Sequence, residues 1–207
     1  MVITYVAQGF VKIQFGSTVI AVNPVDKKVM PEAPRFGSSL VLVSLKDPYC
    51  SGIETVSYGE KRPFVIDGPG EYEVGGLYIK GLKTITREGK INTVYSLLLE
   101  QVNVCNLGLL DTPVLDEEVQ EELGDIDVLF LPVGDRVLSP AAASKVAAIL
   151  EPKLVIPLGF GEKKEVAKHL TSFLKEEGIK DIKPLDKLTL KRRDLEGKEG
   201  EVMLLQP

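Results

Sequence analysis

Tryptophan is absent from this 207-residue sequence, and aromatic residues make up only 6% of it. Proteins that bind single-stranded nucleic acid stack successive bases on aromatic side chains, and this composition offers no such platform. The chain has one histidine, His169, and two cysteines, Cys50 and Cys105. A single imidazole excludes any catalytic or metal site built from several histidines. Two cysteines cannot form the disulfide framework of a small secreted protein.

Long apolar runs are also missing. Runs such as residues 128–131 fall far short of the roughly 20 residues that a membrane span requires. Residues 1–6 show neither a basic leader nor the apolar core of a signal peptide. A low cysteine content is typical of a reducing compartment. We therefore expect a cytoplasmic protein with no membrane partner.

The charge balance is acidic, with 25 basic and 30 acidic residues and a formal net charge of −5. A broad basic surface for nucleic acid is not expected from this balance, so we expect no nucleic-acid partner. The basic run at residues 187–193 alternates with apolar residues, which indicates a solvent-facing strand. No phosphate-binding Gly-Lys-Ser/Thr loop, Gly-x-Ser-x-Gly elbow or Cys-x-x-Cys pair occurs.

The hydrophobic pattern divides the chain into two halves. The first hundred residues show short alternating or β-branched runs typical of strands, whereas the second half alternates apolar runs with helical spacing. No linker separates the halves, so we expect a single domain over residues 1–207, with sheets flanked by helices. The predicted strands are 2–6, 10–15, 18–22, 40–44, 64–66, 77–86, 93–99, 102–105, 128–132, 154–157, 189–191 and 202–205, and the predicted helices are 114–123, 141–150 and 163–177.

Three short segments have local interpretations. The glycine-rich residues 68–72 predict a turn before a strand. Residues 111–113 predict the entry cap of a helix. Residues 192–200 predict a turn between the last two strands, and His169 is expected on the surface of the third helix.

Seven blocks of sequence resemble the metallo-β-lactamase superfamily. Residues 41–50, VLVSLKDPYC, are similar to the strand and loop that carry its Thr-His-x-His-x-Asp-His motif. The other blocks resemble the branch that contains ascorbate-6-phosphate lactonase-like hydrolases. The resemblance implies an α/β (α+β) fold, a four-layer αββα sandwich. The other blocks are residues 3–10, 19–24, 68–74, 104–110, 127–134 and 152–160.

The metal-binding positions of that family are altered in this sequence. In the family, histidine and aspartate side chains hold two divalent metal ions, which activate a water for hydrolysis. Zinc needs three or four such ligands, and leucine and glycine supply no donor atom. The resemblance therefore implies a member with no metal cofactor and no catalytic residues. The aligned positions hold Leu45, Asp47, Tyr49, Cys50, Asn106, Leu109 and Gly159, while Gln8 and Asn23 replace a histidine and an aspartate.

Two functions follow as hypotheses. The first is a non-catalytic member, a pseudoenzyme, that binds a small polar ligand in the vestigial pocket or binds a protein, including a second copy of this chain. The second is a hydrolase of the lactonase or phosphodiesterase type, with a relocated or metal-free site. The residues that the resemblance assigns to the vestigial pocket are Gln8, Asn23, Asp47, Tyr49, Cys50 and Asn106.

Two of these residues have alternative interpretations. Cys50 could be a nucleophile, but no histidine stands near it in the sequence, and a thiolate needs a base or a positive field. A packed thiol is the simpler interpretation. Asp47 precedes a proline, so it is either a loop-turn carboxylate or a residual acid of the pocket.

Overall fold

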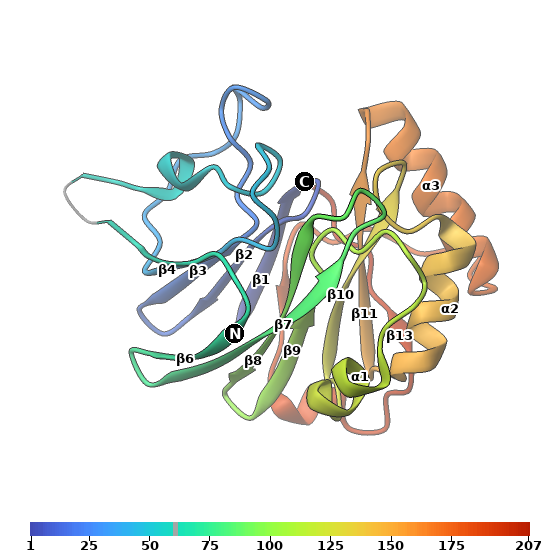
Figure 1. The fold of residues 1–207 in the computed structure, drawn as a ribbon. Helices are drawn as coiled ribbons and strands as arrows, with labels where there is room; N and C mark the ends of the chain where they lie inside the picture. The colour runs from blue at the N-terminus through green and yellow to red at the C-terminus, as the bar shows by residue number, and fades with distance from the viewer. Residues whose placement is uncertain (60–61) are drawn as a thin grey trace.

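The computed structural model describes residues 1–59 and 62–207, and in it two β-sheets face each other (Figure 1). Three α-helices lie against the outer face of the second sheet, as the alternating second half of the sequence predicts. Outside the first sheet, the described residues form loops and one short 3₁₀ helix, η1 (Ile53–Val56). The predicted sandwich of two sheets with outer helices is therefore present.

The first sheet is built mainly from the N-terminal half of the chain. Its strands run in the order β12-β1-β2-β3-β4-β5. Strands β1, β2 and β3 form an antiparallel meander. Strand β4 then pairs in parallel with β3, and β5 pairs in parallel with β4. The strands are β1 (Val2–Ala7), β2 (Phe10–Phe15), β3 (Thr18–Val22), β4 (Leu40–Leu42), β5 (Phe64–Ile66) and β12 (Leu188–Thr189).

The second sheet has the order β13-β11-β10-β9-β8-β7-β6. Neighbouring strands from β6 to β9 are antiparallel, and β9, β10, β11 and β13 are parallel. The strands are β6 (Gly70–Val74), β7 (Leu77–Ile85), β8 (Ile91–Leu99), β9 (Val102–Asn106), β10 (Val128–Gly134), β11 (Leu154–Phe160) and β13 (Glu201–Val202), and the helices are α1 (Glu117–Leu123), α2 (Pro140–Leu150), α3 (Lys163–Glu176) and the 3₁₀ helix η2 (Arg192–Leu195).

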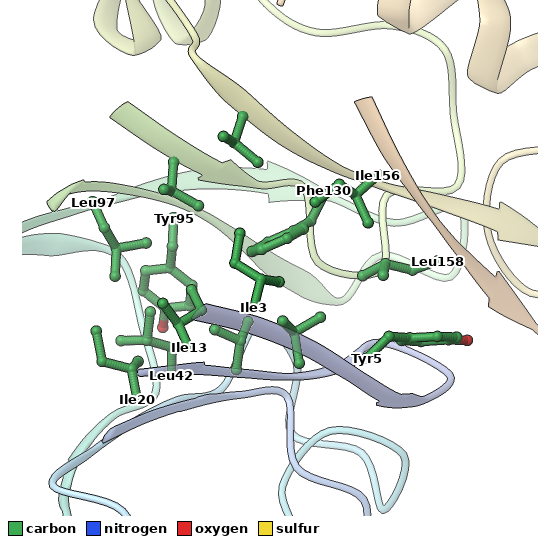
Figure 2. Close-up of a cluster of buried hydrophobic side chains, with 14 of the residues drawn as sticks. Ile3, Tyr5, Ile13, Ile20, Leu42, Tyr95, Leu97, Phe130, Ile156 and Leu158 are labelled. Atoms are coloured by element: carbon green, nitrogen blue, oxygen red, sulfur yellow. The ribbon is translucent and has the colours of Figure 1, made fainter. Parts of the chain in front are cut away.

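The main core lies between the two sheets, because successive strand residues point to opposite faces. Figure 2 shows Ile3 and Ile13 of the first sheet directed toward Phe130 and Ile156 of the second. A second core lies between the second sheet and the helices, and it contains Cys105. Cys105 is fully buried on the face of β9 opposite Asn106, as its place in the strand predicts.

Helices α1 and α2 differ in how their first turns are capped. Ser139 caps α2 by accepting a hydrogen bond from the Ala142 amide, and Pro140 occupies the first turn, where its missing N–H costs nothing. By contrast, α1 begins at Glu117, three residues later than predicted. The residue before it, Asp116, has ψ near 144° and so lies outside the helix.

The predicted turn at residues 68–72 is wrong in part, because Gly70–Val74 forms the edge strand β6. It pairs with β7 through a two-residue loop, Gly75 and Gly76, both with positive φ. Such a loop requires two left-handed residues and matches the twist of a hairpin, which glycine allows without strain.

The last two strands do not pair with each other. β12 joins β1 in the first sheet, while β13 joins β11 in the second, so the segment between them connects the two sheets. Asp127 anchors this segment, since its carboxylate accepts hydrogen bonds from Arg192 at 2.5 Å and from Lys153 at 2.7 Å. Arg192 therefore belongs to an ion pair and not to an open basic face. In the part of the chain that the structure describes, no helix is long and apolar enough to cross a membrane.

Candidate functional site

Loops from both sheets meet at one edge of the sandwich. They follow β1, β4, β9, β10 and β11, and their residues line adjoining cavities. In sheets with parallel strands, the carboxyl ends of the strands are where ligands commonly bind. The edge contributes Gln8, Tyr49, Leu109, Arg136 and Gly161 to these cavities.

Asp47, Tyr49 and Arg136 form one cluster at this edge. The Asp47 carboxylate accepts a hydrogen bond from the Tyr49 amide at 3.0 Å and another from Arg136 Nη2 at 3.2 Å. The guanidinium carbon of Arg136 lies 4.8 Å from the centre of the Tyr49 ring, within cation–π range. Asp47 is therefore a turn carboxylate that also holds Arg136, and its role as an acid of the pocket stays a prediction.

Gln8 connects two turns at the next part of the edge. Its side chain makes two hydrogen bonds to Gly161, donating to the carbonyl at 2.8 Å and accepting from the amide at 3.1 Å. This pairing holds the turn after β1 against the turn after β11. Gln8 and Tyr49 both line two cavities of about 450 Å³ and 250 Å³.

Cys50 is fully buried beneath this edge. Its thiol donates a hydrogen bond to the Leu45 carbonyl at 2.7 Å. Burial in an apolar environment raises the pKa of the Cys50 thiol from 9.0 to about 12. The thiol therefore stays protonated at neutral pH, which makes it a poor nucleophile.

Asn23 and Asn106 are buried and converge on Ser44. Asn23 Oδ1 accepts a hydrogen bond from the Ser44 amide at 2.8 Å, and Asn106 Nδ2 donates to the Ser44 hydroxyl at 3.1 Å. Neither asparagine lines the two cavities at Gln8 and Tyr49. Of the six residues assigned to the vestigial pocket, Gln8 and Tyr49 line the cavities, Asp47 is bonded to the cavity-lining Arg136, and Asn23, Cys50 and Asn106 lie in the interior.

Sequence reasoning missed Arg136, which directly follows a buried strand and its Gly134-Asp135 end. The position of residues 135 and 136 after a parallel strand is a signal that could have identified them. It also missed the partner of His169, whose Nε2 lies 2.7 Å from Asp135 Oδ1. His169 is on α3 as predicted, but its side chain is only 18% exposed and faces this edge.

Residues 111–113, which the sequence predicts to cap a helix, make a different contact in the structure. Asp111 accepts hydrogen bonds from the Arg87 amide at 2.9 Å and 3.2 Å, and α1 begins five residues beyond Thr112. Asp111 therefore ties the loop after β9 to the hairpin between β7 and β8. The cap prediction fails because a residue distant in sequence supplies the donor.

The residues at this edge do not fit the two-metal centre of the resembled family. Leu45 and Leu109 belong to the core between the sheets, and Asn106 is committed to Ser44. Position 159 is a glycine, and a Cβ there would lie 2.3 Å from Val166 Cγ1 of α3. Among residues 1–59 and 62–207, no group of three His, Cys, Asp or Glu side chains could hold a metal ion.

Several solved structures are similar over almost the whole chain. A proposed Zn-dependent hydrolase of the metallo-β-lactamase superfamily from Thermotoga maritima shares 29% identity and a TM-score of 0.77, covering 99% of each chain. A proposed metal-dependent hydrolase from Parabacteroides distasonis shares 17% identity, with a TM-score of 0.66 and coverage of 99% of this chain and 93% of that one. A metallo hydrolase from Ignicoccus hospitalis shares 15%, with a TM-score of 0.63 and coverage of 92% and 98%. The last two likenesses concern the fold alone.

A comparison with curated proteins finds no match to this sequence. The family profile described as the beta-lactamase superfamily domain matches residues 2–159, well over half of the chain. The matched region contains both sheets' central strands and the edge formed by Gln8, Asp47 and Arg136. The chain therefore belongs to the metallo-β-lactamase superfamily.

Proposed function

We propose that this chain is a non-catalytic member of the superfamily that binds a small ligand at the edge formed by Gln8, Tyr49 and Arg136. One observation carries the proposal: at this edge Leu45, Leu109 and Gly159 have no side-chain donor atom, and the Asn106 amide and the Asp47 carboxylate are engaged by Ser44 and Arg136. Leu45 and Leu109 are 8% and 4% exposed. A hydrolytic zinc site requires at least three ligands around the ion, and these residues do not supply them.

The two leucines have a structural role of their own. Burying a leucine side chain stabilises a protein by roughly 1.5–3 kcal/mol relative to leaving it exposed. A carboxylate or imidazole at the same position would need a metal or a hydrogen-bond partner to offset its desolvation. Leu45 and Leu109 therefore support a centre that stays folded without a cation.

Direct contacts between loops replace the cross-links that metal ions would supply. Gln8 joins the turn after β1 to Gly161, and Asp47 joins the loop after β4 to Arg136. The loop after β10 is joined to α3 by the contact between Asp135 and His169. Because these links need no ion, the edge keeps its shape in the metal-free protein.

Open cavities beside these links support binding. The Tyr49 ring and the Gln8 amide lie at the junction of two cavities, and Arg136 supplies a charge that is half exposed. Ligand sites commonly combine apolar walls with a few polar groups of this kind. A protein partner, including a second copy of the chain, stays a prediction that light scattering of the purified protein tests.

Elemental analysis of tag-free protein is the direct test. We expect zinc, manganese and iron well below one equivalent per chain, and no turnover of lactone or phosphodiester substrates before or after metal addition. Asp47→Asn and Cys50→Ser should leave the metal content unchanged. Near-stoichiometric metal that falls in either variant would overturn the proposal, as would turnover of either substrate class by metal-stripped protein.

A further inference from the structure

Two cavities adjoin at Gln8, Tyr49 and Gly161, which line both of them. The smaller cavity, of about 250 Å³, contains Arg136 above Leu109. The larger one, of about 450 Å³, lies between the end of β1, the loop after β3 and the start of α3. Its apolar wall is formed by Val25, Val29, Met30 and Val166.

Arg136 occupies two groups at this junction that would attract a cation, the Tyr49 ring and the Asp47 carboxylate. Its guanidinium lies over the Tyr49 ring and is paired with the Asp47 carboxylate. Asp135, the next carboxylate along the cavity wall, is paired with His169. A ligand with a cationic group would therefore have to displace Arg136 or His169 to reach Asp47 or Asp135.

Hydrogen-bond donors remain at the same place. A guanidinium carries five N–H donors, and among the described residues Arg136 donates one side-chain hydrogen bond, to Asp47. The Asp47 carboxylate has a second donor in the Tyr49 amide, so it does not depend on Arg136 alone. The remaining N–H groups can take a carboxylate in the paired geometry that arginine favours.

We propose that the two cavities form one binding site for an organic monocarboxylate with an apolar tail. The carboxylate binds the Arg136 guanidinium, and the tail occupies the cavity lined by Val29, Met30 and Val166. This inference rests on the proposed function, because it names the ligand class of the same edge. Two further carboxylates, Glu32 and Glu162, line the cavities, but both are exposed to solvent, which screens their repulsion.

Calorimetry with three probes that share one tail tests the charge of the head group. We expect octanoate to bind the tag-free protein at least about tenfold more tightly than octylamine or octanol, because only octanoate forms charge-assisted hydrogen bonds with Arg136. Acetate, which lacks the tail, should bind more weakly than octanoate. Binding of octylamine or octanol as tight as that of octanoate would overturn the inference.

Matched variants test the two parts of the site. Arg136→Met should weaken octanoate binding about tenfold or more, whereas Arg193→Met, at an exposed arginine on η2, should leave it unchanged. Val29→Trp, at a partly exposed position, should fill part of the tail cavity and weaken octanoate binding without affecting acetate. Octanoate binding that survives Arg136→Met would overturn the inference.

The two proposals fail in different ways. Metal-free protein that binds no octanoate would overturn this inference and leave the proposed function standing. Stoichiometric metal held by Asp47 or Cys50 would overturn the proposed function, whatever the calorimetry gives.

Discussion

The hydroxyl of Tyr95 on the second sheet donates a hydrogen bond of 2.9 Å to the carbonyl of Val43, just beyond β4 of the first sheet. The same hydroxyl lies 3.2 Å from the Ile66 carbonyl at the end of β5. Figure 2 shows the Tyr95 side chain crossing the core between the sheets. Val43 leads directly into Ser44 and the loop of the candidate site, so this contact fixes the base of that loop.

Replacing Tyr95 with phenylalanine should destabilise the protein. The change leaves the buried Val43 carbonyl without its donor, which costs about 1–3 kcal/mol, whereas the Ile66 carbonyl keeps the Val43 amide. Urea denaturation followed by circular dichroism gives the free energy of unfolding. Tyr78→Phe, at a tyrosine that is 49% exposed, is the control and should change little. Equal stability of the two variants would contradict the assigned role of Tyr95.

Asp127→Ala should loosen the segment that connects the two sheets. The Asp127 carboxylate is buried and bonded to Lys153, Arg192 and the Asn103 amide. We expect a loss of about 2–3 kcal/mol in the free energy of unfolding, less than for a fully buried pair because Arg192 is half exposed. Thermal denaturation measures this loss of stability, and Asp181→Ala, at an exposed aspartate, is the control. A loss no greater than that of the control would show that the ion pairs of Asp127 do not stabilise the fold.

Replacing Leu109 with aspartate should not create a metal site. Leu109→Asp places a carboxylate in the core, and we expect it to cost about 4 kcal/mol or more, from lost apolar burial and desolvation of the charge. Val114→Asp, at a residue that is 71% exposed, should have little effect. The melting temperature of Leu109→Asp, measured with and without zinc, tests this prediction. A melting temperature that returns to the wild-type value when zinc is added would contradict it, because it would show that the variant holds the ion.

Stability should fall at alkaline pH. Burial raises the pKa of Cys50 from 9.0 to about 12, and burial also raises the pKa of Cys105 and Tyr95. Between pH 9 and 12 the unfolded chain has lost the Cys50 proton while the folded chain keeps it, so the unfolded state is favoured as pH rises. The stability contributed by the two cysteines is thus fully present below pH 9 and declines above it, by about 1.4 kcal/mol per pH unit for each thiol, while the contribution of Tyr95 declines only above pH 10.

Denaturant titrations from pH 7 to 10 measure this decline. A flat profile above pH 9 would contradict the assigned burial of these groups. Cys50→Ala should reduce the slope, because it removes one of the groups that lose a proton only on unfolding.

The sequence predicts the layers of the fold well, because hydrophobic period is a local property. The continuous apolar runs of β10 and β11 are buried on both faces, as expected for central parallel strands under helices. The hairpin loop at Gly75 and Gly76 shows the limit of such reasoning. Gly68 and Gly70 are compatible with a turn alone, and only the pairing with β7 makes Gly70–Val74 a strand.

The candidate site is less predictable because its contacts join residues far apart in the sequence. Arg136 meets Asp47 across 89 positions, and Gln8 meets Gly161 across 153. At such separations, the charge and type of a residue do not identify which of many possible residues it will contact. A resemblance to a known family draws attention to positions such as Leu109, but not to Arg136, which lines the same cavity.

Gly159 lets α3 rest directly on the end of β11, so close that a Cβ would meet Val166. A histidine could not be accommodated at this position by a single substitution, since α3 would have to shift or Val166 would have to become smaller. Placing any larger side chain at this end of β11 therefore needs a compensating change in the helix that covers it.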